Sequence, residues 1–124
     1  MTPKFRALDK ISKKMFPVMM IDFGQSYVMI EEINGLWCER DFDEIELMSS
    51  TGLKDKNGKE IFEGDIVRFT LTDGFSYVTI EGGVVTYKLC AFYVVNDLDE
   101  YLISDIKTNK AEVIGNVFEV EVSK

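Results

Sequence analysis

The chain is 124 residues long, 46% of its residues are hydrophobic, and its net charge is −8. This size and composition suit one folded domain and exclude a wholly disordered chain. The sequence has no histidine, which removes the commonest general base and metal ligand, and its two cysteines, Cys38 and Cys90, are too few for a disulfide framework.

The first fifty residues alternate between apolar and polar side chains, with turn residues between the runs, a pattern that predicts short β-strands. Strands are expected at Lys4–Leu8, Met15–Phe23, Tyr27–Ile33 and Leu36–Arg40. Asn34-Gly35 predicts a hairpin turn between the last two. Asp41–Ser50 is compatible with a helical first turn, because acidic residues crowd its start, or with a strand preceded by a loop.

The remainder of the chain also predicts strands. They are expected at Asp65–Leu71, Phe75–Leu89, Cys90–Asp97 and Ala111–Val122. A turn is expected at Thr72–Gly74, breaks at Gly82-Gly83 and, within the last strand, at Gly115-Asn116, and a short strand or one helical turn within Leu98–Lys110. Short strands spaced roughly 8–12 residues apart indicate a small barrel or sandwich.

The most patterned stretch is "TGLKDKNGKEIFEGDIV", from Thr51 to Val67. Asn57-Gly58 predicts a type I′ turn, in which both central residues need positive φ. Gly64 permits a sharp bend, and Asp65 is expected to accept hydrogen bonds from backbone amides at that corner. These residues therefore predict a turn followed by the abrupt start of a strand.

The same stretch has some features of three kinds of functional site. A phosphate-binding loop is disfavoured because five residues separate Gly52 from Gly58 and Glu60 stands where Ser or Thr is needed. A calcium loop is disfavoured because its glycine comes two places early and lysines would lie inside it. An acid–base pair of Glu63 and Asp65 has no neighbouring nucleophile. Structural turns are the favoured interpretation.

The stretch also resembles the YopX-like family, small proteins of phages and prophages with no assigned function. The similarity extends to "KFRALDKISKKMFPV" near the start and "EVIGNVFE" near the end, whereas Phe75–Asp105 is weakly patterned. Leu8 stands where the family often has Trp. The resemblance implies an SH3-like β-barrel in the C-terminal part, entered through "EGDIV", and it implies no catalytic residue.

Charge offers two further candidates. Residues 1–20 hold five basic side chains and one acidic one, Asp9, so their net charge is +4. The rest of the chain therefore has a net charge of −12, which gives −8 overall. The basic segment could contact nucleic acid, although a solvated turn is the simpler interpretation. The acidic run Asp41, Asp43, Glu44 and Glu46 could mimic a nucleic-acid backbone, but a solvated face is again simpler.

Aromatic residues and cysteines are further candidates for a functional site. A stacking platform for single-stranded nucleic acid could be built from Trp37, Phe69, Phe75, Tyr77, Tyr87, Phe92, Tyr93 and Tyr101. Such platforms are interleaved with Lys and Arg, and here only Arg68 and Lys88 are close, so positions in the core and rim are favoured. Cys38 has no basic partner except Arg40, two residues on, so an activated thiol is not supported, and each cysteine is expected to be buried or inert.

These observations predict a mostly β protein, with a β extension at residues 1–50 and an SH3-like barrel at residues 51–124. We expect a non-enzymatic interaction module without catalytic residues, metal or cofactor, whose partner is a protein or a second copy, because unpaired sheet edges favour self-association. The alternative is a nucleic-acid-associated accessory protein that uses the basic N-terminal segment. The longest apolar run, Phe16–Ile21, is too short for a secretory or membrane segment, so a cytoplasmic protein is expected.

Overall fold

The computed structural model describes residues 4–72 and 74–120, and most of them lie in antiparallel strands, which confirms a mostly β protein. The strands are β1 (Phe5–Asp9), β2 (Met15–Asp22), β3 (Tyr27–Glu31), β4 (Trp37–Asp41), β5 (Ile45–Lys54), β6 (Glu60–Phe62), β7 (Asp65–Thr72), β8 (Tyr77–Lys88), β9 (Ala91–Val95), β10 (Glu100–Leu102) and β11 (Glu112–Asn116). Three 3₁₀ turns and one short helix complete the described structure: η1 (Phe42–Glu44), η2 (Ile103–Asp105), η3 (Thr108–Lys110) and α1 (Val117–Val120).

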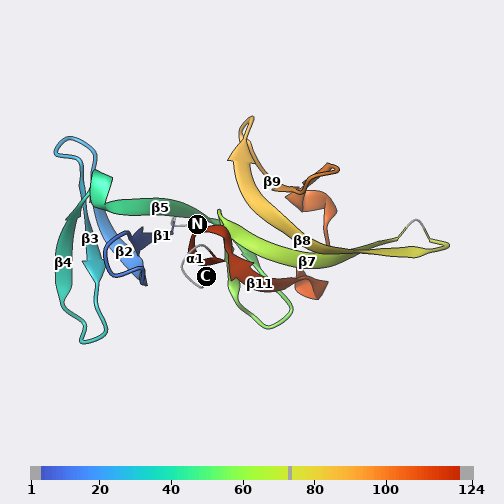
Figure 1. Cartoon of the computed structure of the whole chain (residues 1–124), viewed down its shortest axis with the longest axis horizontal. Helices are drawn as coiled ribbons and strands as arrows, with labels where there is room; N and C mark the ends of the chain where they lie inside the picture. Colours follow the sequence, from blue (N-terminus) through green and yellow to red (C-terminus); the bar gives the residue numbers. More distant parts are fainter. Residues whose placement is uncertain (1–3, 73, 121–124) are drawn as a thin grey trace. The chain divides into compact units, whose positions relative to one another are not determined.

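The chain divides into two compact units, Met1–Ser49 and Ser50–Lys124. Strand β5 begins in the first unit and ends in the second. Its first five residues pair with β1, and further along Ser50 and Lys54 pair with Phe62 and Glu60 of β6. The same strand, β5, therefore pairs with a strand of the first unit at its start and with a strand of the second unit at its end (Figure 1).

The first unit is an antiparallel sheet in the order β4-β3-β2-β1-β5. Strand β3 alternates fully buried Val28 and Ile30 with half-buried neighbours, as expected for a strand that covers a core with one face. Ala7 of β1 lies opposite Phe16 of β2 on that same face. The buried members of this core are Ala7, Val28, Ile30 and Ile45, with Phe16, Val18, Ile21, Cys38, Phe42 and Leu47 packed against them.

The second unit contains the sheet β10-β9-β8-β7-β11, in which the last strand returns to lie beside β7. Its core is formed by Ile61, Val67, Phe69, Val85, Val94, Ile103, Ile106 and Ala111. Strands β8 and β9 approach closely at Gly83, where an added Cβ would lie 2.4 Å from a methyl group of Val94. The long strand β8 curves visibly along its length (Figure 1).

The pairings found among the described strands leave both sheets open, so the closed SH3-like barrel expected at residues 51–124 is not found. The expected strand at Ala111–Val122 is wrong beyond Asn116, because residues 117–120 form α1 and residues 121 and 122 lie outside the described part. The side-chain oxygen of Asn116 accepts a hydrogen bond from the amide of Phe118 at 2.9 Å, which favours a helical turn there.

Two ambiguous segments are resolved. Asp41–Ser50 contains η1 followed by the first part of β5, and the amide of Asp41 donates to the Glu44 carboxylate at 2.8 Å, which stabilises that turn. Leu98–Lys110 contains β10, η2 and η3. No helical segment within residues 4–72 and 74–120 has the length and apolar character needed to cross a membrane.

The Asn57-Gly58 turn is present, but its expected type is wrong. Gly58 has φ of +79°, whereas Asn57 is not among the residues with positive φ. The amide of Gly58 donates to the carbonyl of Asp55 at 3.0 Å, and the amide of Asp55 donates to the carbonyl of Lys59 at 2.8 Å. This pattern fits a three-residue hairpin loop in which only the last residue is left-handed.

Candidate functional site

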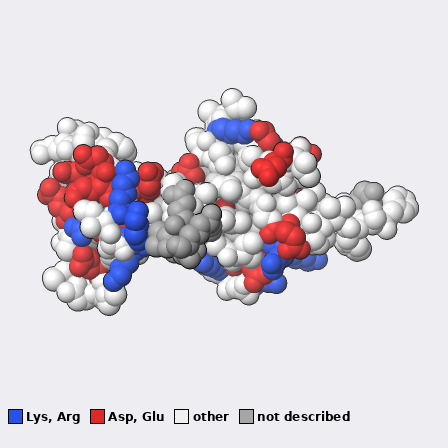
Figure 2. Space-filling model, in the orientation of Figure 1, with Lys and Arg blue, Asp and Glu red and all other residues white. Residues whose placement is uncertain are grey.

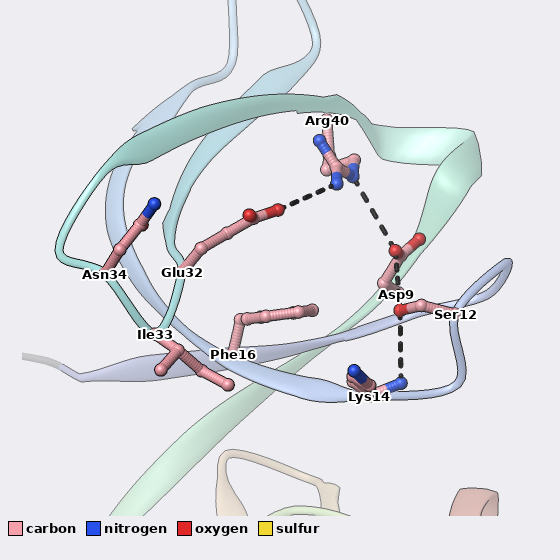
Figure 3. Close-up of a pocket in the computed structure, with 8 residues that line it drawn as sticks. All are labelled: Asp9, Ser12, Lys14, Phe16, Glu32, Ile33, Asn34 and Arg40. Atoms are coloured by element: carbon pink, nitrogen blue, oxygen red, sulfur yellow. Dashed lines mark hydrogen bonds and ion pairs between the residues drawn. The ribbon is translucent and has the colours of Figure 1, made fainter.

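The first unit contains an open pocket of about 330 Å³ beside its two adjacent turns (Figure 3). Its floor and walls come from the end of β1, the β1–β2 turn, the start of β2, the β3–β4 turn and the middle of β4. The lining residues are Asp9, Ser12, Lys14, Phe16, Glu32, Ile33, Asn34 and Arg40. The pocket thus gathers charged groups from positions that are far apart in the sequence.

Asp9 is the buried centre of this pocket, with only 4% of the residue exposed. Its carboxylate accepts hydrogen bonds from the Ser12 hydroxyl at 2.8 Å and from the amide of Ile11 at 3.3 Å. The guanidinium of Arg40 lies 3.8 Å from Asp9 and 3.3 Å from the Glu32 carboxylate, so it connects the two acids (Figure 3).

The surroundings of Asp9 determine its protonation state. Burial by itself would raise the pKa of this carboxyl group, but the hydrogen bonds from Ser12 and Ile11 and the charge of Arg40 outweigh that effect and lower its pKa. Asp9 is therefore a carboxylate at neutral pH. A group in this state holds the β1–β2 turn in place and has no proton to donate to a substrate.

The pocket's polar groups are directed toward one another. The Ser12 hydroxyl donates to Asp9, and the amide of Lys14 donates to the Ser12 oxygen at 3.4 Å. Within residues 4–72 and 74–120, no group of three or more cysteine, aspartate or glutamate side chains is placed to hold a metal ion. The arrangement accounts for a stable turn, and we assign it no chemical step.

The patterned stretch from Thr51 has a structural centre at Asp55, which is 5% exposed. One carboxylate oxygen accepts from the amides of Asn57 and Lys59, each at 2.9 Å, and the other accepts from the amide of Val113 at 2.9 Å. Burial would raise the pKa of Asp55, but these three amides and the Lys59 charge lower it. Asp55 therefore fixes its own turn and connects it to β11.

Asp65 has the role at the strand corner that the sequence predicted. Its carboxylate accepts a hydrogen bond from the amide of Phe62 at 2.7 Å, and its other oxygen lies 3.3 Å from the Asn116 side-chain nitrogen. Gly64 has φ of +88°, its amide donates to Val85 and its carbonyl accepts from Val117. The corner is thus a junction of three segments of the second unit.

Among the charged candidates from the sequence, one basic residue is paired and the acidic run extends over three consecutive elements. The Lys10 ammonium donates to the carbonyl of Asp43 at 3.1 Å and lies 3.8 Å from the Glu46 carboxylate. The four residues of the acidic run are divided among the end of β4, η1 and the start of β5. Figure 2 shows acidic residues gathered over the first unit beside a basic stripe, so neither sign of charge covers that face alone.

The aromatic residues do not share one face. Trp37 belongs to the sheet of the first unit, and Phe69 is buried with its ring 5.5 Å from that of Tyr101. Tyr87 and Phe92 contact each other with ring centroids 5.0 Å apart. The described aromatics are therefore divided among separate contacts, which does not favour a continuous stacking platform.

The two cysteines have different surroundings. Cys38 is half-buried and packs against the core of the first unit. Cys90 is exposed and, with Leu89, forms the two-residue turn between β8 and β9, where their φ values are +63° and +51°. Positive φ at both positions is the geometry of a type I′ turn, which the sequence did not predict because neither residue favours it.

Exposed apolar side chains gather on the outer part of the β7–β8 hairpin, residues 70–72 and 74–79, hereafter the arm. Phe75 is 96% exposed, Tyr77 78% and Val78 57%. Strand β11 pairs with β7 only as far as Arg68, and β9 pairs with β8 only from Val84 onward. The arm is therefore a two-stranded ribbon that extends away from its own sheet (Figure 1).

The two faces of the arm differ. Leu71 lies opposite Val78 on the face that continues outward from Phe69 and the core. Thr70 lies opposite Thr79 on the other face, with their hydroxyl oxygens 3.4 Å apart. The sequence of the arm has one charged residue, Asp73, which lies outside the described residues, and the end of the ribbon is white in Figure 2.

Comparisons with known proteins identify a family and similar solved structures. The model of the YopX protein family matches residues 4–121. The crystal structure of protein EF1440 from Enterococcus faecalis is similar with a TM-score of 0.62 and 28% sequence identity, covering 98% of this chain and 96% of that one. A search of curated proteins finds no match. The similarity thus extends over both units.

Proposed function

The chain belongs to the YopX protein family, and on that premise we propose that it is a small accessory protein, encoded by a phage or prophage, that acts by binding a protein. The phage setting is what the family resemblance implies. Binding without catalysis agrees with a pocket in which Arg40 pairs with both Asp9 and Glu32. The proposed place of action is the cytoplasm of the bacterial host.

The observation that carries this proposal is the arm. Soluble proteins rarely leave aromatic and β-branched residues exposed together on a projecting segment with little charge unless another molecule covers it. Tyr and Phe supply large contact areas with little loss of side-chain entropy, which is why such residues dominate the energetics of interfaces. Phe75 and Tyr77 are placed to be the central contacts of such an interface.

The second unit, in this proposal, is an opened relative of the SH3-like barrel. The support is its strand order, in which four consecutive strands form a meander and β11 returns beside the first of them after the turns η2 and η3. The first unit acts as the β extension that accompanies it. The barrel-like unit then serves as a scaffold that holds the base of the arm.

The test is site-specific photo-crosslinking in cells that carry the induced phage or prophage. A photoreactive residue replaces Tyr77 in the arm, and a control chain carries it at Leu98, which is 94% exposed on another turn of the same unit. We expect discrete protein adducts from position 77 and none from position 98. Absence of adducts from position 77 would contradict the proposal.

The alternative function is nucleic-acid association through the basic N-terminal segment. It is the weaker candidate because Lys10 is already paired with Glu46 and the whole chain carries a charge of −8. A mobility-shift assay at low and high salt tests it. Binding that weakens steeply with salt would favour this alternative over the protein-binding one.

A further inference from the structure

We propose that the partner of the arm is a second copy of this chain, joined by antiparallel pairing of the outer edges of the two β8 strands at Tyr77–Ile80. This inference rests on the proposed function, because it names the protein that the arm binds. It follows from the sheet edges, the distribution of charge and the symmetry of antiparallel pairing.

The outer edge of β8 is open where the arm begins. On one side, β8 pairs with β7 from Tyr77 through Ile80. On its other side, β9 covers only Val84–Lys88, so among the described strands none pairs with the outer edge of Tyr77–Ile80. An open edge presents backbone N–H and C=O groups that another strand can pair with.

Among the described strands, the outer edge of β7 is also uncovered at Phe69–Thr72, whereas several other sheet edges carry features that oppose such pairing. Strand β4, at the edge of the first sheet, has three charged residues among its five, Glu39, Arg40 and Asp41. Strands β6 and β10 are only three residues long. Strand β11 is interrupted by a register shift between Val113 and Gly115. Charged, short and irregular edges are the usual protections against edge-to-edge association. Tyr77–Ile80 contains no charged residue, and the register shift of β8 lies beyond it, between Ile80 and Gly83.

The charge of the chain favours contact at the arm over contact elsewhere. Each copy carries −8, so two copies repel each other wherever carboxylates meet. The charged surface ends at the base of the arm, where Arg68 binds Glu81 at 2.9 Å and Glu112 at 3.1 Å. Contact between the segments Tyr77–Ile80 brings uncharged side chains together and keeps the acidic surfaces of the two copies apart.

Antiparallel pairing of a strand with its own copy has two-fold symmetry, so it closes at a dimer and does not continue into a fibre. The pairing converts two ribbons of two strands into one sheet of four. An isolated two-stranded ribbon is marginally stable in water, whereas a wider sheet with an apolar face is more stable. Val78 and Leu71 of each copy would form that common face.

The experiment is sedimentation of the full chain over the micromolar concentration range. We expect the wild-type mass to approach that of two chains, and Val78→Lys to reduce it to the mass of one. Leu98→Lys is the matched control, because it adds the same charge at an exposed apolar residue, and it should remain dimeric. Circular dichroism establishes that each variant is folded.

A second measurement keeps the test independent of the folding of Val78→Lys. In a background with Cys38 and Cys90 replaced by serine, Thr79→Cys should give a covalent dimer with a short bismaleimide, and Leu98→Cys should not. A wild-type chain that stays monomeric, or a Thr79→Cys chain that does not cross-link, overturns the inference. If that monomer still forms adducts with another protein through position 77 in cells, the proposed function stands and only the second copy is excluded.

Discussion

Asp55 and Val113 are 58 residues apart in the sequence, and the carboxylate of the first accepts a hydrogen bond of 2.9 Å from the amide of the second. The same carboxylate also orders the turn that contains Gly58. A single buried side chain therefore couples the local geometry of the YopX stretch to the position of β11.

We expect Asp55→Asn to lower the free energy of unfolding by about 2 kcal/mol, because an amide nitrogen would replace one of the oxygens that accept from buried backbone N–H groups. Chemical denaturation measures the change. Asp97→Asn is the control, since Asp97 is exposed in the turn before β10, and it should change stability little. Equal effects of the two substitutions would contradict the role assigned to Asp55.

Stability should fall in acid because Asp9 and Asp55 both have a lowered pKa in the folded chain. Their unfolded value is 3.8, so at low pH the unfolded chain binds more protons than the folded one. The stabilisation is complete above about pH 5 and is lost as the pH falls through the folded pKa values. Denaturation midpoints measured from pH 7 down to pH 3 test this.

The Ser12→Ala variant separates the contribution of Asp9. It removes the hydroxyl that donates to Asp9 at 2.8 Å, so the pKa of Asp9 should rise and the loss of stability should begin at higher pH. A pH profile identical to that of the wild type would show that this hydrogen bond does not control the titration.

The cost of replacing Gly58 should depend on whether the new residue can adopt positive φ, and not on the size of its side chain. Its φ is +79°, and an added Cβ would meet no atom within 4 Å. Gly58→Val should therefore cost about 1–2 kcal/mol through backbone strain alone. Gly58→Asn should cost much less, because Asn adopts this conformation readily, and thermal unfolding of the pair distinguishes strain from crowding.

The Leu89-Cys90 turn predicts a stabilising change. Both residues have positive φ, which is unfavourable for L-residues with these side chains. Replacing the pair with Asn-Gly should stabilise the chain by about 1 kcal/mol, measured by chemical denaturation. Cys90→Ser alone is the control, because serine at this position would have the same backbone strain as cysteine. If the Asn-Gly variant is no more stable than the wild type, the explanation is contradicted.

The sequence predicted the features that depend on local chemistry. The hairpin turn at Asn34-Gly35 and the corner at Gly64-Asp65 are confirmed, with positive φ at both glycines and the predicted amide hydrogen bond to Asp65. Glycine and aspartate predict such features because their preferences act within a few residues. The prediction of type I′ geometry for the Asn57-Gly58 turn is wrong, because the length of the loop depends on how the flanking strands pair.

The remaining features depend on contacts that no local pattern contains. Arg40 and Asp9 meet although β3 and β2 separate β4 from β1 in the strand order, and their separation in sequence gives no sign of this contact. The turn at Leu89-Cys90 is imposed by the pairing of β8 with β9, against the preferences of both residues. The exposure of the arm depends on where β9 and β11 end, which no local sequence pattern indicates.

The position of β11 beside β7 also sets an order of events during protein synthesis. In the first unit, β1, β2 and β3 each pair with the next strand, so these neighbours can pair as they emerge from the ribosome, and β5 then adds to β1. In the second unit, β7 must wait for residues 112–116 before its outer side near Asp65 is covered and Asp55 gains its third amide. The nascent chain therefore carries a partly assembled second unit until almost all of its described residues have been translated.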